Sequence, residues 1–149
     1  MLEVYANFYE QCLAIPVVRG RKTEKEKFAG ALATYTVEAM MHDGKALQGA
    51  TSHNFGDGFA HAFDIKYLDK DNQLKYCHQT SWGITTRTIG ALIMAHGDNN
   101  GLVLPPAVAP IQVIVVPVQQ HKEGVLDKAH EVTNKINSFV RAKIDDSDN

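Results

Sequence analysis

Arg87 marks the point where a polar, glycine-containing segment gives way to an apolar one. It follows "SWGITT" and precedes "TIGALIMA", which is apolar on every side and therefore typical of a buried helix. We expect a helix over about 87–96 that starts at Arg87. A helix N-terminus offers free N–H groups and a positive dipole end, and a guanidinium keeps its charge and can stack on a purine. This combination favours a triphosphate ligand; the alternative is a structural arginine paired with a buried carboxylate.

A second polar segment, "QGATSHNFGDGF" (48–59), combines hydrogen-bonding side chains with three glycines. Its candidate ligand contacts are Gln48, Thr51, Ser52 and His53. We expect a polar strand end that enters a Gly-rich loop, where a ligand can approach the backbone closely. The segment has neither the GxxxxGK[ST] of a phosphate loop nor the GxGxxG of a dinucleotide site. Alternatively, Thr51 and Ser52 form a turn and His53 is a hydrogen-bonded histidine without a catalytic role.

The third candidate feature is Ser81-Trp82-Gly83, which lies just before the arginine. At a strand end, a tryptophan beside a glycine can wall a small apolar pocket, because the glycine leaves room for a ligand. For the tryptophan alone, an ordinary place in the core is the alternative.

Composition and charge restrict the class of protein. The chain has 149 residues, the length of one ordinary domain, and a formal net charge of -2, which does not indicate nucleic-acid binding. Cys12 and Cys77 are far apart and lack a CxxC pattern, so we expect two reduced cysteines in a cytosolic protein. The seven histidines form no HExxH or HxxxH pair, which argues against a metal site. No apolar run has membrane-spanning length.

The elements that would position these residues follow from periodicity and turn signals. Apolar residues at helical spacing predict a helix that Pro16 ends, followed by a short strand at 15–18 and a charged loop at 19–30. The β-branched "TYTVEAMM" predicts a strand that ends at the turn "HDGK". Next we expect a strand, the Gly-rich loop, a second strand, a hairpin turn at 69–72, and a returning strand over 73–84.

The character of the sequence changes after Pro105-Pro106. The run "IQVIVVPV" (111–118) predicts a strand covered on both faces, and a one-sided apolar pattern predicts a helix over 123–143. This is the first βα of an α/β unit, and we expect no second strand before Asn149. We therefore interpret the chain as a piece of a larger protein, with the end of one domain at 1–105 and a truncated start of another at 106–149.

Taken together, these segments resemble prolyl-tRNA synthetase of the type shared by archaea, eukaryotes and some bacteria. The resemblance rests on "ALQGATSHNFGDGFAHAFDI" and "HQTSWGITTRTIGALIMAHGDNNGLVLPPAVAPIQVIVVPV", a long ordered set that covers most of the chain. Within it, "GITTRTIG" resembles the third signature motif of class II synthetases, with Arg87 as its arginine. Thr85-Thr86 would be the prolyl-type variant of a motif that commonly has more glycines.

The resemblance implies an α+β fold. It consists of part of the antiparallel sheet with flanking helices of the class II catalytic domain, then the beginning of an α/β anticodon-binding domain. It also implies that proline reacts with ATP, carried with Mg2+, to give prolyl-adenylate, and that the prolyl group passes to tRNA(Pro). Members of this family are homodimers, but the motif that forms the dimer is absent here. We expect a cytoplasmic protein with no membrane partner.

Individual site roles also follow from the resemblance. Arg87 would be the catalytic arginine and hold the adenine face and the γ-phosphate of ATP, while Gln48 and Thr51 would contact the ribose and phosphate side. The residues implied for the proline site are His53, Ser81, Trp82 and Gly83. No residue is implied as a metal ligand.

Three expected parts of the family's active site have no counterpart in this sequence. They are the first motif, which builds the dimer interface, the second motif with its phosphate-binding arginine, and the Thr-x-Glu element for the proline imino group. We therefore expect the isolated chain to be inactive. The alternatives are a non-catalytic, synthetase-derived binding or regulatory module and an unrelated small nucleotide-binding domain.

Overall fold

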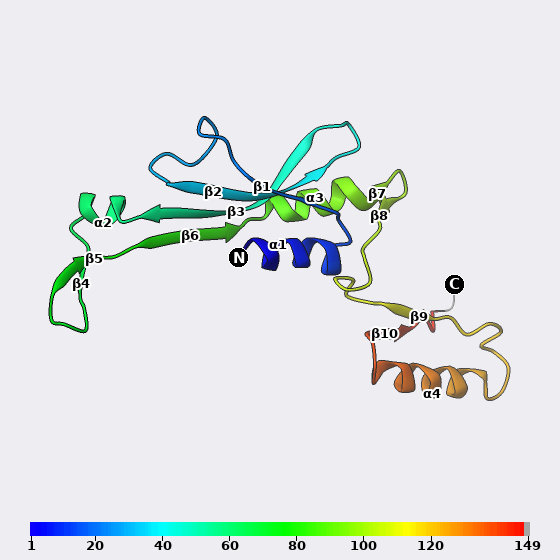
Figure 1. Cartoon of the computed structure of the whole chain (residues 1–149). Helices are drawn as coiled ribbons and strands as arrows, with labels where there is room; N and C mark the ends of the chain where they lie inside the picture. The colour runs from blue at the N-terminus through cyan, green and yellow to red at the C-terminus, as the bar shows by residue number, and fades with distance from the viewer. Residues whose placement is uncertain (148–149) are drawn as a thin grey trace. The chain divides into compact units, whose positions relative to one another are not determined.

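The computed structural model describes residues 1–147, which form two compact units that divide between Val103 and Leu104. Figure 1 shows their helices and strands. The first unit is built around a four-stranded sheet and also contains two small hairpins, whereas the second has a two-stranded sheet. Within residues 1–147, no helix is long and apolar enough to cross a membrane.

The four-stranded sheet is antiparallel, in the order β1-β2-β3-β6. Its strands are Val18–Arg21 (β1), Ala33–Met40 (β2), Ala46–Gly56 (β3) and Gln79–Ile84 (β6). The strand and turn predicted from "TYTVEAMMHDGK" are confirmed by β2 and its connection to β3. The strand expected at 15–18 is wrong in position. β1 begins at Val18, the last residue of the predicted strand, and extends into the predicted charged loop, because its backbone pairs with β2 from Val18 to Arg21.

Helical segments pack against this sheet and build the core of the first unit. The helix α1 (Leu2–Asn7) continues into a π-helical turn, η1 (Phe8–Cys12), and lies on one face of the sheet in Figure 1. Tyr9 is fully buried, and its hydroxyl group is 2.9 Å from Thr88 Oγ1 in α3 (Arg87–His96). His96 Nε2 is also 2.7 Å from the Leu13 carbonyl oxygen. These two bonds join α3 to the N-terminal helix.

The helix predicted over 87–96 is confirmed with those bounds, but the expectation that it is buried on all sides is wrong. Ala91 and Leu92 are buried, whereas Ile89, Ile93 and Met94 are 58%, 49% and 49% exposed. A helix buries only the stripe that faces a partner. In the described unit, α3 packs against β3 and η1, so its other side remains open to solvent.

The Gly-rich loop expected within 48–59 is instead the second half of a strand and a short helix. β3 continues to Gly56, and α2 (Gly58–Ala62) begins almost immediately afterwards. Backbone pairing of β3 with strands on both sides explains this difference, since the ladder with β2 covers residues 46–54 of β3 and the ladder with β6 continues to Gly56. The segment is therefore more rigid than a loop.

Two small hairpins complete the first unit. The predicted turn at 69–72 joins β4 (Lys66–Leu68) to β5 (Leu74–Tyr76), and these strands pair only with each other. The single strand expected over 73–84 is therefore divided into β5 and β6, with Cys77 and His78 between them. In and just after the "HGDNNG" segment (96–101), β7 (Gly97–Asp98) pairs with β8 (Gly101–Leu102).

The second unit is a βαβ unit, which corrects two expectations. Its elements are β9 (Val113–Val115), α4 (Val125–Asn137) and β10 (Ala142–Ile144). The prediction that β9 lacks a neighbour within the chain is wrong, because β10 pairs with it in parallel. The apolar run at 111–118 is also not covered on both faces, since Ile114, Val116 and Val118 are exposed. The helix predicted over 123–143 ends at Asn137, and the chain then turns back to form β10.

Arg141, which lies just before β10, holds the beginning of the second unit through hydrogen bonds to backbone carbonyl groups. Its Nη2 donates to the carbonyl oxygens of Ala109, Ala107 and Pro106 at 2.8, 3.0 and 3.2 Å, and its Nε donates to Ala109 at 2.9 Å. Its backbone N–H also donates to Gln112 Oε1 at 2.8 Å. One planar guanidinium therefore holds the chain that leads into β9.

Candidate functional site

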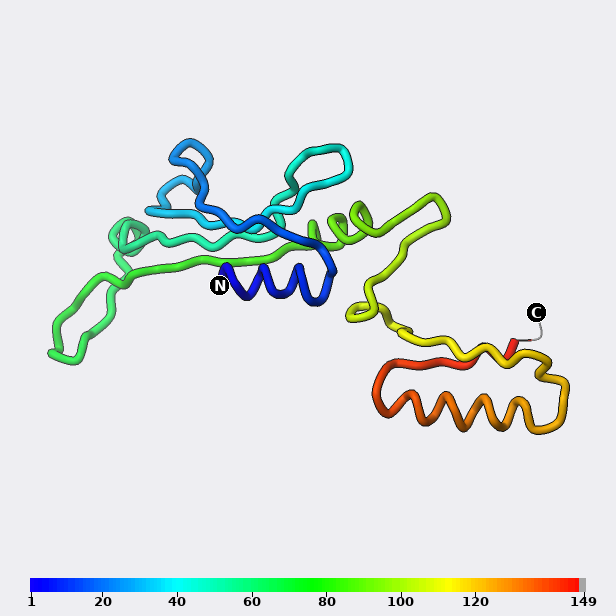
Figure 2. The backbone as a smooth tube through the Cα atoms, turned by 45° about the vertical axis from the view of Figure 1, so that its right-hand side comes forward, coloured from blue at the N-terminus to red at the C-terminus, as the bar shows by residue number. Residues whose placement is uncertain are grey.

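Four polar side chains of β2 and β3, namely Thr34, Gln48, Thr51 and His53, lie on the face of the sheet opposite α1. In Figures 1 and 2 the connection between β1 and β2 rises on the side of the sheet away from α1. A pocket of about 220 Å³ lies beneath this connection. Its lining residues come from the connection, β2 and β3, and they are Lys22, Glu26, Phe28, Thr34, Gln48, Thr51 and His53. Three of the residues predicted for ligand binding thus share one pocket.

Gln48 reaches this pocket because β3 contains a bulge. Along a regular strand, side chains alternate between faces, which would place Gln48 opposite Thr51 and His53. In the pairing with β2, however, Val37 faces Ala50 and Glu38 faces Gln48, so Gly49 is an extra residue. The bulge shifts the alternation by one position. As a result Gln48 and Thr51 lie on one face in spite of their odd spacing.

Close packing on the other side of the sheet explains why the bulged residue is a glycine. A Cβ atom on Gly49 would lie 2.7 Å from Tyr9 Cζ and 2.8 Å from Tyr9 Oη. Because Tyr9 is fully buried, its ring has no open space into which it could move. The glycine therefore lets the helical layer approach β3 at the point where the strand changes its alternation.

His53 is hydrogen-bonded through both ring nitrogens to threonine hydroxyl groups. Nδ1 is 2.9 Å from Thr34 Oγ1, and Nε2 is 3.1 Å from Thr51 Oγ1. Aromatic rings enclose the imidazole, with the Phe28 centroid at 5.1 Å and the Phe55 ring stacked at 5.8 Å. Burial lowers the pKa of His53, and the nearby Lys22 ammonium lowers it further. The imidazole is therefore neutral near pH 7.

A neutral His53 makes stability depend on pH in a defined direction. The lowered pKa means that the folded state favours the neutral ring, while the unfolded state titrates near the ordinary value of about 6.5. This contribution is fully present above that value and is lost as the pH falls toward the lowered pKa. In the wild type, the free energy of unfolding should decrease between about pH 7.5 and pH 5.5. We expect this decrease to be smaller in His53→Gln, as measured by urea titrations at each pH.

The matched control for this experiment is His78→Gln, because His78 is an exposed histidine of the same unit. It should leave the pH dependence unchanged. An identical pH dependence in wild type and His53→Gln would show that His53 does not contribute to it.

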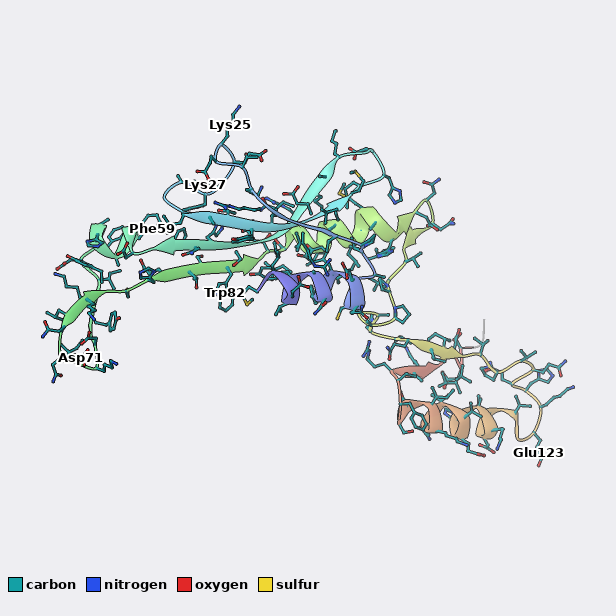
Figure 3. The ribbon with its side chains drawn as sticks, viewed as in Figure 1. Lys25, Lys27, Phe59, Asp71, Trp82 and Glu123 are labelled. Carbon is teal, nitrogen blue, oxygen red and sulfur yellow. The ribbon has the colours of Figure 1, made fainter. Side chains whose placement is uncertain are left out.

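The strand β6 brings two of its three candidate residues to the pocket face. In the pairing with β3, Ser81 lies opposite His53 and Gly83 lies opposite Thr51. Residues directly opposite in an antiparallel pair share a face of the sheet. Trp82 pairs with Ser52 and is therefore on the other face, where Figure 3 shows it on the side of α1. It is 54% exposed, so it is neither a core tryptophan nor a wall of this pocket.

Arg87 lies at the start of α3, as predicted. β6 ends at Ile84, opposite Ala50, so Arg87 follows at the same end of β3 as Gln48. Its backbone N–H donates to Thr85 Oγ1 at 3.3 Å, but its guanidinium has no hydrogen bond or ion pair with any residue in 1–147. The alternative of a structural arginine paired with a buried carboxylate therefore does not apply to the described part of the chain.

Sequence reasoning missed the residues that the β1–β2 connection and β2 contribute to the pocket. Lys22, Glu26 and Phe28 belong to the segment that we predicted as a solvated charged loop. Lys22 Nζ is 3.5 Å from Glu38 Oε1, so part of that charge is paired on the sheet. The sequence signal that could have indicated the part of β2 is the alternation of polar residues at Thr34, Thr36 and Glu38.

Comparison with known proteins adds the family. Residues 1–96 match the model of the tRNA synthetase class II core domain (G, H, P, S and T). This match includes well over half of the chain. The chain belongs to this family. The class II core match ends at His96, the last residue of α3, so every candidate ligand residue lies inside it.

Individual members of the family show which of its enzymes the chain resembles. It is 70% identical over 148 residues to the proline–tRNA ligases of Ruminiclostridium cellulolyticum and Lachnoclostridium phytofermentans. It is 67% identical over 148 residues to the proline–tRNA ligase of Clostridium novyi. Each alignment covers 99% of this chain and 31% of the relative. The chain therefore spans about a third of the length of the curated relatives that it matches, and the expected resemblance to this ligase family is confirmed.

Proposed function

We propose that the chain is part of a proline–tRNA ligase of the type shared by archaea, eukaryotes and some bacteria. This enzyme activates proline with ATP to prolyl-adenylate and transfers the prolyl group to tRNA(Pro). The observation that carries the proposal is the convergence of Gln48, Thr51 and His53 on one pocket, directly beside Ser81 and Gly83. The identity of 70% to proline–tRNA ligases supports the same function.

The size of the pocket indicates which part of the substrates it takes. At about 220 Å³ it is smaller than the roughly 300–1,000 Å³ that is usual for a drug-sized ligand. It suits a group of the size of proline, with His53, Ser81 and Gly83 around it. Trp82 lies on the opposite face of the sheet, so we limit its proposed role to an indirect one, in which it affects the position of β6.

The nucleotide would extend from this pocket toward α3. Gln48 and Thr51 would contact its ribose and phosphate side, and Arg87 would hold the adenine face and the γ-phosphate. In the reaction the proline carboxylate attacks the α-phosphate, so the protein needs no covalent nucleophile. Its contribution is to position the reactants and to stabilise developing charge.

Mg2+ would enter with the phosphates of ATP. Within residues 1–147, no group of three or more His, Cys, Asp or Glu side chains could hold a metal ion. These residues alone therefore do not fit a protein-built metal site, and the roles given above do not depend on the ion.

The proposal extends to the organisation of the whole enzyme. Residues 1–105 would belong to the catalytic domain and residues 106–149 to the start of an anticodon-binding domain. The βαβ unit formed by β9, α4 and β10 is compatible with an α/β domain of that kind. A homodimer in the cytoplasm is part of the same proposal.

Proline-dependent exchange of pyrophosphate into ATP tests the function. We expect no exchange by the isolated chain, because the α-phosphate then lacks the arginine of the second motif. Losing one such contact typically costs about 2.7–4 kcal/mol of transition-state stabilisation. Exchange should appear when the chain is joined to the remaining two thirds of the Ruminiclostridium cellulolyticum ligase.

Two outcomes would contradict this proposal. Robust exchange by the pure isolated chain would show that it is not an incomplete part of the enzyme. No exchange after the joining, together with a stable complex with another protein, would instead support a non-catalytic binding or regulatory module.

A further inference from the structure

Thr34 carries a buried hydroxyl group beside the proposed site. The residue is 1% exposed, although its side chain is polar. Its Oγ1 has two hydrogen-bond partners, the Phe28 backbone N–H at 3.1 Å and His53 Nδ1 at 2.9 Å. A buried hydroxyl group needs an acceptor for its own proton, since an unsatisfied donor costs about 1–3 kcal/mol.

The identity of these partners determines the direction of the hydrogen bonds. The Phe28 N–H can only donate, so Thr34 Oγ1 accepts from it. Among the residues that the structure describes, His53 Nδ1 is then the one acceptor available to the Thr34 proton. If Nδ1 carried a proton instead, Thr34 would accept twice and its own proton would remain unpaired in the interior. The contacts therefore favour an unprotonated Nδ1.

The same reasoning continues across the imidazole ring. A neutral histidine with an unprotonated Nδ1 carries its proton on Nε2. Nε2–H then donates to Thr51 Oγ1, 3.1 Å away. The Thr51 hydroxyl proton has no acceptor within residues 1–147 and is free for a group in the pocket, which Thr51 also lines.

We propose that Thr34 is a positioning residue that holds His53 in the Nε2–H tautomer and so makes Thr51 a hydrogen-bond donor toward the pocket. The ligand group that fits a hydroxyl donor is an anionic oxygen, either a carboxylate oxygen of the amino acid or a phosphate oxygen of ATP. The choice of these ligands rests on the proposed function. The tautomer itself depends only on the contacts within the chain.

Nitrogen NMR of the histidine rings in the full 149-residue chain tests the tautomer directly. The His53 signals would be assigned by their disappearance in His53→Gln. In the wild type we expect Nδ1 to resonate as an unprotonated nitrogen and Nε2 as a protonated one. Thr34→Val should move the two signals toward each other, because the ring then populates both tautomers. Thr34→Ser keeps the hydroxyl group and should restore the wild-type pattern.

Thr51→Val is the matched control, because it removes a hydroxyl group from the other side of the ring. It should leave Nδ1 unprotonated, since Thr34 still donates there. A protonated Nδ1 in the wild type, or an unchanged spectrum in Thr34→Val, would overturn the proposal. If Thr34→Val does not fold, the wild-type spectrum and Thr34→Ser still decide between the two tautomers.

Calorimetry with ATP on the same variants separates this inference from the proposed function. We expect Thr34→Val to weaken ATP binding about two- to tenfold, the range for one neutral hydrogen bond, and Thr34→Ser to bind as the wild type does. If the wild-type chain shows the expected tautomer but binds neither ATP nor proline, the assignment of these ligands to the pocket fails and the role of Thr34 stands. If ATP binds and the wild-type Nδ1 is protonated, the ligand assignment stands and the role of Thr34 fails.

Discussion

Replacing Arg87 with alanine is expected to weaken ATP binding by the chain roughly 10- to 100-fold. A hydrogen bond to a charged group contributes about 1.5–3 kcal/mol, and the helix N-terminus adds to the same attraction. Because the guanidinium is exposed and has no partner within residues 1–147, its removal leaves no buried carboxylate unpaired. The free energy of unfolding should therefore change little, which makes the binding effect easy to interpret.

Two further variants make the Arg87 experiment specific. Arg87→Lys keeps the charge but loses the planar face that can stack on a purine, so we expect binding between those of the wild type and Arg87→Ala. Lys135→Ala removes a positive charge from α4 in the second unit and should bind ATP as the wild type does. Equal ATP affinity in wild type and Arg87→Ala, measured by calorimetry, would show that Arg87 does not hold the nucleotide.

Gly49→Ala is expected to lower the free energy of unfolding by about 1–3 kcal/mol, the usual cost of overpacking a close-packed core. The new methyl group would meet Tyr9 at 2.7 Å, and Tyr9 is fixed by burial and by its bond to Thr88. Either the ring or the bulge in β3 must move. Movement of the bulge would also displace Gln48, so the variant should lose ligand affinity together with stability. Urea unfolding and calorimetry measure the two effects.

Gly90→Ala is the matched control for this substitution. Gly90 lies in the middle of α3, and a Cβ atom there meets no atom within 4 Å. Alanine is the better helix former by about 1 kcal/mol, so this variant should be more stable than the wild type. If Gly49→Ala were as stable as Gly90→Ala, the close contact with Tyr9 would have no energetic importance.

Local patterns in the sequence predicted the elements whose signals are local. The turn residues between β2 and β3, the hairpin turn at 69–72 and the bounds of α3 depend on neighbouring residues, and each is confirmed. The shared position of Thr51 and His53 follows from a period of two along a strand. These parts of the site could be read from the sequence.

Other parts depend on contacts between distant segments. Neither the bulge at Gly49 nor the burial of Thr34 has a signature in the residues beside it, because each arises from packing against another element. The face on which Trp82 lies follows from the β3–β6 register, which a single strand does not reveal. The pairing of β10 with β9 was missed because "RAKI" is too short and too polar to stand out as a strand.

The contacts of Arg141 determine how the second unit could be divided into two pieces. A break in the connection between β9 and α4 would leave the carbonyl groups of Pro106, Ala107 and Ala109 on one fragment and the guanidinium on the other. The parallel pairing of β9 with β10 would also cross the break. The two fragments would therefore carry complementary backbone and side-chain partners, which is the property that split reporter proteins use to reassemble without a covalent link.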